Sequence, residues 1–376
     1  MTTAIDPVAL ASRLIACPSI TPEKGGAQAV LEEVLTGLGF SVHRMMSGEA
    51  PDGPVANLFA TRGSGGPHFA FAGHTDVVPP GKGWATDPFI AEIRGGLLHG
   101  RGAVDMKGSI AAFLAAAARI PDHQGTLSLI ITGDEEGPAR YGTVSLMEWM
   151  AERAIRPDMI LVGEPTSENR LGDTIKIGRR GSVNLFITVI GHQSHVAYPH
   201  QGDNPITRLI RIGSRLNAME LDDGTDWFEA SNLEITTVDV GNSAHNVIPG
   251  EAYMRLSIRF NTEHSGAGLV ERVRAIVNEE APEAWFEALI SGEAFLTEPG
   301  PLTEIVTTAI RDVTGLDPKL STSGGTSDAR YLHRLCPIVE FGLLNATMHK
   351  LDEAVAIDDL HTLTDIYEAV LKRAMG

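Results

Sequence analysis

The first half of the chain alternates between two hydrophobic periods. Apolar residues between Ala27 and Leu38 recur every three or four positions and stop at two glycines, which predicts an amphipathic helix. Helical periodicity returns over 110–120 and 143–153. Short apolar runs predict strands at 57–61, 68–73, 127–132 and 158–163. Strands that alternate with helices in this way predict a largely parallel sheet covered on both faces.

The hydrophobic pattern changes near Gly178–Gly181. Further on, strands are predicted at 183–190, 233–238, 254–260 and 285–290, with helices from Asn204 and over 269–277 between them. This βαββαβ order is that of the split βαβ, ferredoxin-like unit, which is a complete small domain. After Leu296, a helix, a strand at 337–342 and a final helix resume the first pattern. We therefore expect an α/β domain over 1–180 and 294–376 with a mostly parallel central sheet, interrupted by an inserted α+β domain over 181–293.

Charge and composition narrow the classes of partner. The chain has 376 residues and a formal net charge of −18, so its field repels polyanions, and we expect neither a nucleic-acid nor a membrane partner. The longest apolar run, 110–118, is shorter than the ~18 residues that indicate a membrane span.

The N-terminal segment lacks the basic region of a signal peptide, and Asp6–Pro7 predicts a helix start there instead. Cys17 and Cys336 are the only cysteines, which favours a reducing compartment such as the cytoplasm.

Two polar clusters follow predicted elements in the first third of the chain. His74 and Asp76 come directly after the strand at 68–73, two residues apart and therefore on one face. An imidazole that binds a metal through one nitrogen donates the other to a carboxylate, which this spacing would provide, although a polar loop is the alternative. Asp105 lies among glycines ahead of a helix. That segment lacks the endings typical of nucleotide-binding loops, so we interpret Asp105 as a metal ligand.

Acidic residues follow two more of the predicted strands. Asp134, Glu135 and Glu136 come after 127–132, and Glu164 comes after 158–163. Such a run of acids is usually a solvated turn. Ligands of open α/β sheets, however, bind at the carboxyl ends of the strands, where both groups lie. His349 follows the strand at 337–342, although a lone histidine is more often structural.

Two histidines and several carboxylates without cysteine fit a site for two divalent cations that share a carboxylate and activate a water for hydrolysis. Imidazole and carboxylate ligands suit zinc, and cobalt or manganese can substitute. The adjacent Glu135 and Glu136 offer one acid as a metal ligand and one as a base for the water. We therefore expect two Zn²⁺ ions per subunit.

These motifs resemble those of the zinc aminoacylase and carboxypeptidase superfamily of co-catalytic metallohydrolases, over essentially the whole chain. The resemblance rests on segments 73–79, 100–108, 134–138 and 162–165. It implies that His74, Asp105 and Glu164 bind one zinc ion, and that Asp105, Glu136 and His349 bind the other. It also implies that Asp76 orients His74 and that Glu135 is the general base.

A second set of motifs is similar to that of the desuccinylases in this superfamily, which hydrolyse the amide of N-succinyl-L,L-diaminopimelate in lysine synthesis. These motifs occupy 176–182, 195–200, 245–249 and 323–328. The matching substrate-binding positions are Arg179, Tyr198, Asn246, Arg259, Gly325 and Thr326. A solvated Arg179–Arg180 pair is the alternative for that segment. An acetylornithine deacetylase-like amidohydrolase and a non-catalytic binding protein on the same fold are the alternative functions.

The resemblance further implies a homodimer in which the inserted domain is a lid and dimerisation domain. His195 of that domain would reach the active site of the neighbouring subunit and stabilise the oxyanion, a contribution that is typically ~2.7–4 kcal/mol. Ser194 stands where the family motif has glycine, and Arg140–Tyr141 after the acidic segment is also atypical.

Overall fold

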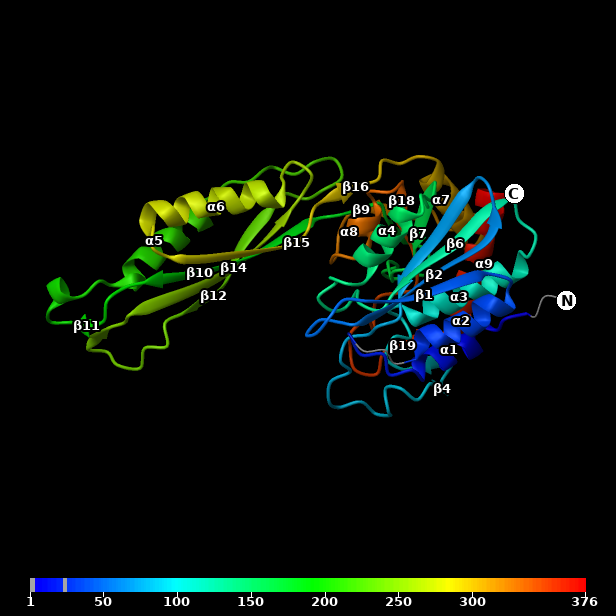
Figure 1. The fold of residues 1–376 in the computed structure, drawn as a ribbon, viewed down its shortest axis with the longest axis horizontal. Helices are drawn as coiled ribbons and strands as arrows, with labels where there is room; N and C mark the ends of the chain where they lie inside the picture. Colours follow the sequence, from blue (N-terminus) through cyan, green and yellow to red (C-terminus); the bar gives the residue numbers. More distant parts are fainter. Residues whose placement is uncertain (1–3, 23–25) are drawn as a thin grey trace. The chain divides into compact units, whose positions relative to one another are not determined.

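The computed structural model of the chain describes residues 4–22 and 26–376, which divide into two compact units (Figure 1). The first unit extends to Ile177 and resumes over Thr297–Ser321 and Ser327–Gly376. The second unit comprises Gly178–Leu296 together with Thr322–Thr326. Within the described residues, no helix is both long and apolar enough to cross a membrane.

An eight-stranded sheet forms the centre of the first unit, in the order β1-β2-β6-β3-β7-β18-β8-β17. Its strands are β1 (Ser41–Ser47), β2 (Val55–Ser64), β3 (His68–His74), β6 (Gly125–Thr132), β7 (Met159–Val162), β8 (Thr174–Lys176), β17 (Lys319–Ser321) and β18 (Ile338–Glu340). Pairing is parallel from β6 through β3 and β7 to β18, and again between β8 and β17. It is antiparallel at β1-β2, β2-β6 and β18-β8. The predicted α/β class with a mostly parallel central sheet is confirmed.

Helices cover this sheet. They are α1 (Pro7–Ile15), α2 (Ala27–Gly37), α3 (Lys107–Arg119), α4 (Thr143–Glu152), α7 (Pro301–Thr314), α8 (Ala329–Leu332) and α9 (Ile357–Met375). Phe113 of α3 stacks on Phe71 of β3 with 4.0 Å between the ring centroids, and Tyr367 of α9 meets both rings edge on. This buried aromatic contact fixes α3, and with it the residues at its amino end, against the middle of the sheet.

The parallel strands bring their carboxyl ends together. His74, the last residue of β3, lies opposite Thr132, the last residue of β6. Ala72 of β3 lies opposite Val162, the last residue of β7. The segments that follow β3, β6 and β7 therefore leave the sheet side by side at one edge. A small sheet, β19 (Ala354–Ala356), β5 (Leu97–His99) and β4 (Glu92–Arg94), joins the segment before α3 to the segment before α9.

The second unit has the predicted βαββαβ order. Its antiparallel sheet runs β12-β14-β10-β15, from strands β10 (Gly181–Ile190), β12 (Asn232–Asp239), β14 (Glu251–Phe260) and β15 (Trp285–Gly292). Helices α5 (Pro205–Asn217) and α6 (Gly266–Glu280) bury the alternate apolar residues of β10 and β14 in one core. Two short pairings flank the sheet, β9 (Gly178–Arg179) with β16 (Phe295–Leu296) and β11 (Ser194–His195) with β13 (Val247–Ile248).

Candidate metal centre

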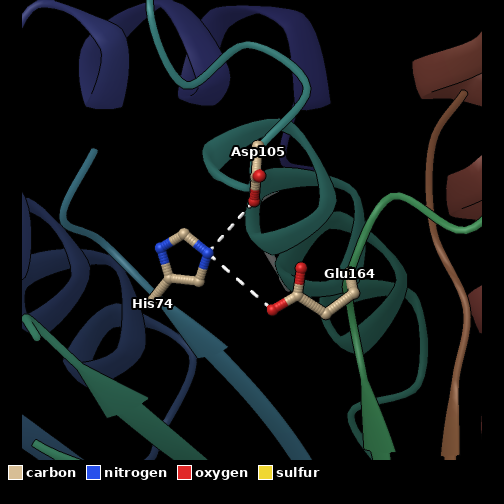
Figure 2. A group of neighbouring side chains, drawn as sticks. All are labelled: His74, Asp105 and Glu164. Carbon is tan, nitrogen blue, oxygen red and sulfur yellow. Dashed lines mark hydrogen bonds and ion pairs between the residues drawn. The ribbon is translucent and has the colours of Figure 1, made fainter. Parts of the chain in front are cut away.

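His74 lies almost fully buried at the carboxyl end of β3. Its Nδ1–H donates to the backbone carbonyl of Asp76 at 2.9 Å, which leaves the other ring nitrogen free to face Asp105 and Glu164. That nitrogen, Nε2, is 3.1 Å from Oδ1 of Asp105 and 3.9 Å from Oε1 of Glu164 (Figure 2). One ligand atom from each of these three residues lies within 4.8 Å of the others. An imidazole and two carboxylates at this spacing can hold one divalent cation.

A second group of the same kind adjoins the first. His349 Nε2 lies 2.8 Å from Oε1 of Glu136 and 3.1 Å from Oδ2 of Asp105. These three residues also have ligand atoms within 4.8 Å of one another. The two oxygens of Asp105 thus face different imidazoles, which is the arrangement that a carboxylate shared by two cations requires.

Electrostatics in this cluster are dominated by the close approach of acids and imidazoles. Burial opposes ionisation of Asp105, but hydrogen bonds from His349 and His74 outweigh it and hold the Asp105 pKa below its ordinary value. Hydrogen bonds with Asp105 and Glu136 raise the pKa of His349 to about 10. The carboxylates of Asp105, Glu136 and Glu164 concentrate negative charge in this cluster, and divalent cations would neutralise it.

The carboxylate of Asp76 lies closer to the acidic segment than to His74. Its Oδ1 and Oδ2 accept the backbone N–H groups of Glu135 at 3.2 Å and Glu136 at 3.0 Å. The same carboxylate is 3.7 Å from Nδ1 of His74, whose hydrogen bond goes to the Asp76 carbonyl instead. Asp76 therefore ties the turn that carries the two glutamates to the end of β3.

Glu135 lies beside the metal-ligand candidates. It forms a further group with His74 and Glu136 in which one ligand atom of each lies within 4.8 Å of the others. Burial, followed by the negative charge of Glu164, raises the pKa of Glu135 well above its ordinary value. A carboxylate in this condition accepts a proton more readily than an exposed glutamate does.

Asp134, the acid that precedes the two glutamates, binds backbone N–H groups of its own loop. Its carboxylate accepts the backbone N–H groups of Ala139 at 3.1 Å, Arg140 at 2.9 Å and Tyr141 at 3.2 Å. The Tyr141 carbonyl accepts from the side chain of Asn57 at 2.7 Å. The atypical Arg140–Tyr141 pair is thus held by its backbone, and Asp134 closes the loop in which Glu135 and Glu136 lie.

The predicted substrate-binding residues all belong to the second unit, where one group lies near the start of β10. Arg179 is buried, and its Nη1 donates to the carbonyl of Gly325 at 2.8 Å, so it is not a solvated arginine. Thr326 follows in the same segment and is exposed. Arg259 of β14 lies opposite Ser182 and donates to its hydroxyl at 2.7 Å.

The other group lies beyond the opposite end of β10. His195 of β11 is exposed, its ring lies 5.7 Å from that of Tyr198, and its Nδ1 accepts from the N–H of Ala197 at 3.1 Å. Asn246 joins this group because its carbonyl accepts from the N–H of Val196 at 3.0 Å. Ser194 has strand backbone within β11, a conformation open to any residue, so the loop accommodates it.

Known proteins resemble the chain over its full length. Residues 70–373 match the family described as Peptidase family M20/M25/M40. A succinyl-diaminopimelate desuccinylase of Rhizorhabdus wittichii is 66% identical over 372 residues, which are 99% of this chain and 99% of that protein. This chain belongs to Peptidase family M20/M25/M40.

Solved structures share the fold of this M20/M25/M40 family member. The M20 family metallo-carboxypeptidase Sso-CP2 of Sulfolobus solfataricus is 17% identical and gives a TM-score of 0.79, with 98% of each chain covered. The Bacillus subtilis YXEP protein, described as a dinuclear metal binding peptidase from M20 family, is 16% identical with a TM-score of 0.72. That comparison covers 98% of this chain and 97% of the Bacillus protein.

The sequence of this M20/M25/M40 family member did not predict Asp328, a buried acid, as a site residue. Asp328 accepts from the hydroxyl of Thr143 at 2.6 Å through one oxygen, and burial raises its pKa to about 6. Its other oxygen is buried and has no hydrogen-bond partner among the described residues. The 323–328 motif, which ends at Asp328, was the signal in the sequence that could have indicated this residue. That motif predicted only substrate-binding residues.

Proposed function

We propose that the chain is a homodimeric dizinc amidohydrolase that cleaves N-succinyl-L,L-2,6-diaminopimelate to succinate and L,L-diaminopimelate, for lysine and diaminopimelate synthesis in the cytoplasm. One observation carries the proposal. Five metal-ligand candidates converge at one edge of the sheet, in a chain that is 66% identical to a succinyl-diaminopimelate desuccinylase over 99% of both lengths.

The donor set supports two zinc ions. His74, Asp105 and Glu164 would hold one, and Asp105, Glu136 and His349 would hold the other. These nitrogen and oxygen donors suit zinc, while cobalt and manganese are chemically close enough to substitute. When bound, zinc polarises the amide carbonyl and makes a water acidic enough to be deprotonated near neutral pH.

Glu135 carries the proton in this proposal. It takes a proton from the attacking water and returns it to the leaving amine, so that the amide bond breaks with a neutral amino group. Its raised pKa supports both steps, because a more basic carboxylate accepts the proton and its acid form can still donate it. Asp76 would keep Glu135 in place through the hydrogen bond to its backbone N–H.

The second unit supplies recognition and the dimer in this proposal. The substrate has three carboxylates, which the guanidinium groups of Arg179 and Arg259 suit. Tyr198, Asn246, Gly325 and Thr326 would complete the contacts to the substrate. The segment 181–293 would act as a lid and as the dimerisation domain, outside the catalytic segments 1–180 and 294–376.

The split of the recognition residues supports a role in trans for one group. Arg259 lies opposite Ser182, near the start of β10, while His195 and Asn246 follow the far end of that strand. The eight steps from Ser182 to Ile190 span about 26 Å of strand, a distance that one small substrate does not bridge. We therefore assign His195, Tyr198 and Asn246 to the active site of the partner subunit, where His195 would stabilise the oxyanion.

Side-by-side assays test this function. The zinc-loaded chain should release succinate from N-succinyl-L,L-diaminopimelate with a much higher kcat/KM than it deacetylates N-acetylornithine. Preference for the acetyl substrate would make it an acetylornithine deacetylase-like enzyme. Turnover of neither substrate, with both metals bound, would favour a non-catalytic binding protein.

A further inference from the structure

Glu353 is a buried acid that has no part in the proposed reaction. Its side chain is fully buried, and its carboxylate receives four N–H donors. Oε1 accepts from the backbone N–H of Val104 at 2.8 Å and of Asp105 at 3.2 Å. Oε2 accepts from the backbone N–H of Gly102 at 3.2 Å and from Nη1 of Arg101 at 2.6 Å. One carboxylate therefore fastens the whole segment 101–105.

That segment ends at the residue on which both halves of the metal centre depend. The oxygens of Asp105 lie 3.1 Å from the imidazoles of His74 and His349, so a small rotation of its backbone would move it away from both. Glu353 holds the N–H of Asp105 itself. The backbone position of Asp105, the shared ligand, is thus set by a hydrogen bond whose acceptor lies 248 residues later in the chain.

Glu353 also connects this segment to the one that carries His349. It lies four positions after His349, and its own backbone carbonyl accepts from the N–H of Gly100 at 2.9 Å. The Arg101 guanidinium that pairs with it is itself buried and lies over the ring of Trp84, 5.1 Å from the centroid. This buried ion pair joins two ligand-bearing segments that are distant in sequence.

We propose that Glu353 is a positioning residue of the metal centre, which sets the affinity for both metal ions by fixing the backbone of Asp105. This inference rests on the proposed metal centre. Residues that hold a metal ligand in place commonly change metal affinity by ~10–100-fold when they are replaced. Glu353 positions Asp105, the ligand that both ions share. Its loss should therefore lower the affinity for both ions and not for one alone.

Zinc titration of the metal-free protein in competition with a chromophoric chelator tests this proposal. In Glu353→Gln, the one remaining oxygen would turn toward the charged Arg101, so that the amide NH2 group faces the N–H groups of Val104 and Asp105, and both zinc dissociation constants should rise ~10–100-fold. The matched control is Asp222→Asn. Asp222 fastens a loop of the second unit by accepting from Gly224 at 2.8 Å and Ser231 at 3.1 Å, so this variant should keep the zinc constants of the unaltered chain.

Two double variants keep the test decisive if Glu353→Gln fails to fold. Both replace the buried ion pair by neutral groups, which protein interiors often accept. Arg101→Gln with Glu353→Gln keeps an oxygen that can accept from Val104 and Asp105, and should bind zinc much as the unaltered chain does. Arg101→Met with Glu353→Met lacks that oxygen and should bind both ions ~10–100-fold more weakly.

The outcomes are separable. Zinc constants of Glu353→Gln within twofold of those of the unaltered chain, or equal zinc binding by the two double variants, would overturn the positioning role. Failure of the unaltered chain itself to bind two zinc ions would instead contradict the proposed metal centre. Circular dichroism and thermal unfolding of each variant distinguish loss of zinc affinity from loss of structure.

Discussion

The imidazole of His349 lies 2.8 Å from the carboxylate of Glu136, although 213 positions separate the two residues in the sequence. Replacement of His349 by alanine should therefore remove one zinc ion and leave the ion held by His74, Asp105 and Glu164. Elemental analysis after dialysis should give about one zinc per chain instead of two. His361→Ala, an exposed histidine on α9, is the control and should keep both. Retention of two ions by His349→Ala would remove His349 from the ligand set.

Glu135→Gln should keep both metals and lose most of the turnover. The amide has nearly the shape of the carboxylate but cannot accept the proton of the water, so kcat should fall ~10²–10⁴-fold with KM little changed. Steady-state kinetics and metal content, measured on the same preparation, check this. Near-normal kcat in a fully loaded protein would exclude Glu135 as the base.

Asp328 should make the metal-free protein less stable as the pH rises. The folded-state pKa of about 6 is above the usual aspartate value of 3.8, so folding favours the protonated carboxyl. Its contribution is fully present below pH 3.8 and is lost as the pH rises through about 6. Asp328→Asn keeps an acceptor for Thr143 without the buried charge. Relative to the unaltered chain, it should gain about 2–3 kcal/mol of unfolding free energy on going from pH 4 to pH 8.

Urea unfolding at the two pH values measures this effect. The unaltered chain provides the reference at each pH, and the difference between the two proteins is the quantity of interest. A difference that is the same at pH 4 and pH 8 would mean that the Asp328 carboxyl does not titrate between those values.

Subunit complementation tests whether His195 acts in the partner's site. His195→Ala and Glu135→Gln should each be nearly inactive as pure dimers. In a mixed dimer, the His195→Ala subunit has an intact Glu135 and receives His195 from the other subunit. Equal mixing with free exchange should therefore restore about a quarter of the activity, because half of the dimers are mixed and each has one complete site.

The same mixture has a clear negative result. If His195 served its own subunit, no mixed dimer would contain a complete site, and activity would stay at the level of the two single variants. Size-exclusion chromatography of the mixture must show dimers for either result to count. A monomeric protein at assay concentration would contradict the homodimer itself.

The sequence predicted the strands that have continuous apolar runs and missed the half-buried strand β1 at one edge of the sheet. Strands β3 and β6 have continuous apolar runs, and their prediction is confirmed. Strand β1 reads Ser-Val-His-Arg-Met-Met-Ser and is only half buried, so its pattern carried no strand signal. Because β1 and β2 pair antiparallel at one edge, the sheet is less uniformly parallel than the alternation of helices and strands indicated.

In the site, side-chain chemistry was predictable and backbone hydrogen bonding was not. Histidines and acids that follow strands could be expected to meet, because the carboxyl ends of parallel strands share one edge. The contacts of Asp134 with the segment 139–141, and of Asp76 with Glu135, join carboxylates to backbone N–H groups. Every residue except proline has such a group, so no residue type marks its position in the sequence. Glu353 was missed for the same reason.

Zinc titration of the metal-free protein, followed by the rate of succinate release from N-succinyl-L,L-diaminopimelate, is the most direct test of the two-metal hydrolase. The rate should rise with added zinc and level off at two equivalents per chain, and a chelator should abolish it. Hydrolysis that persists without metal would contradict the account. A rate that levels off at one equivalent of zinc per chain would contradict it as well.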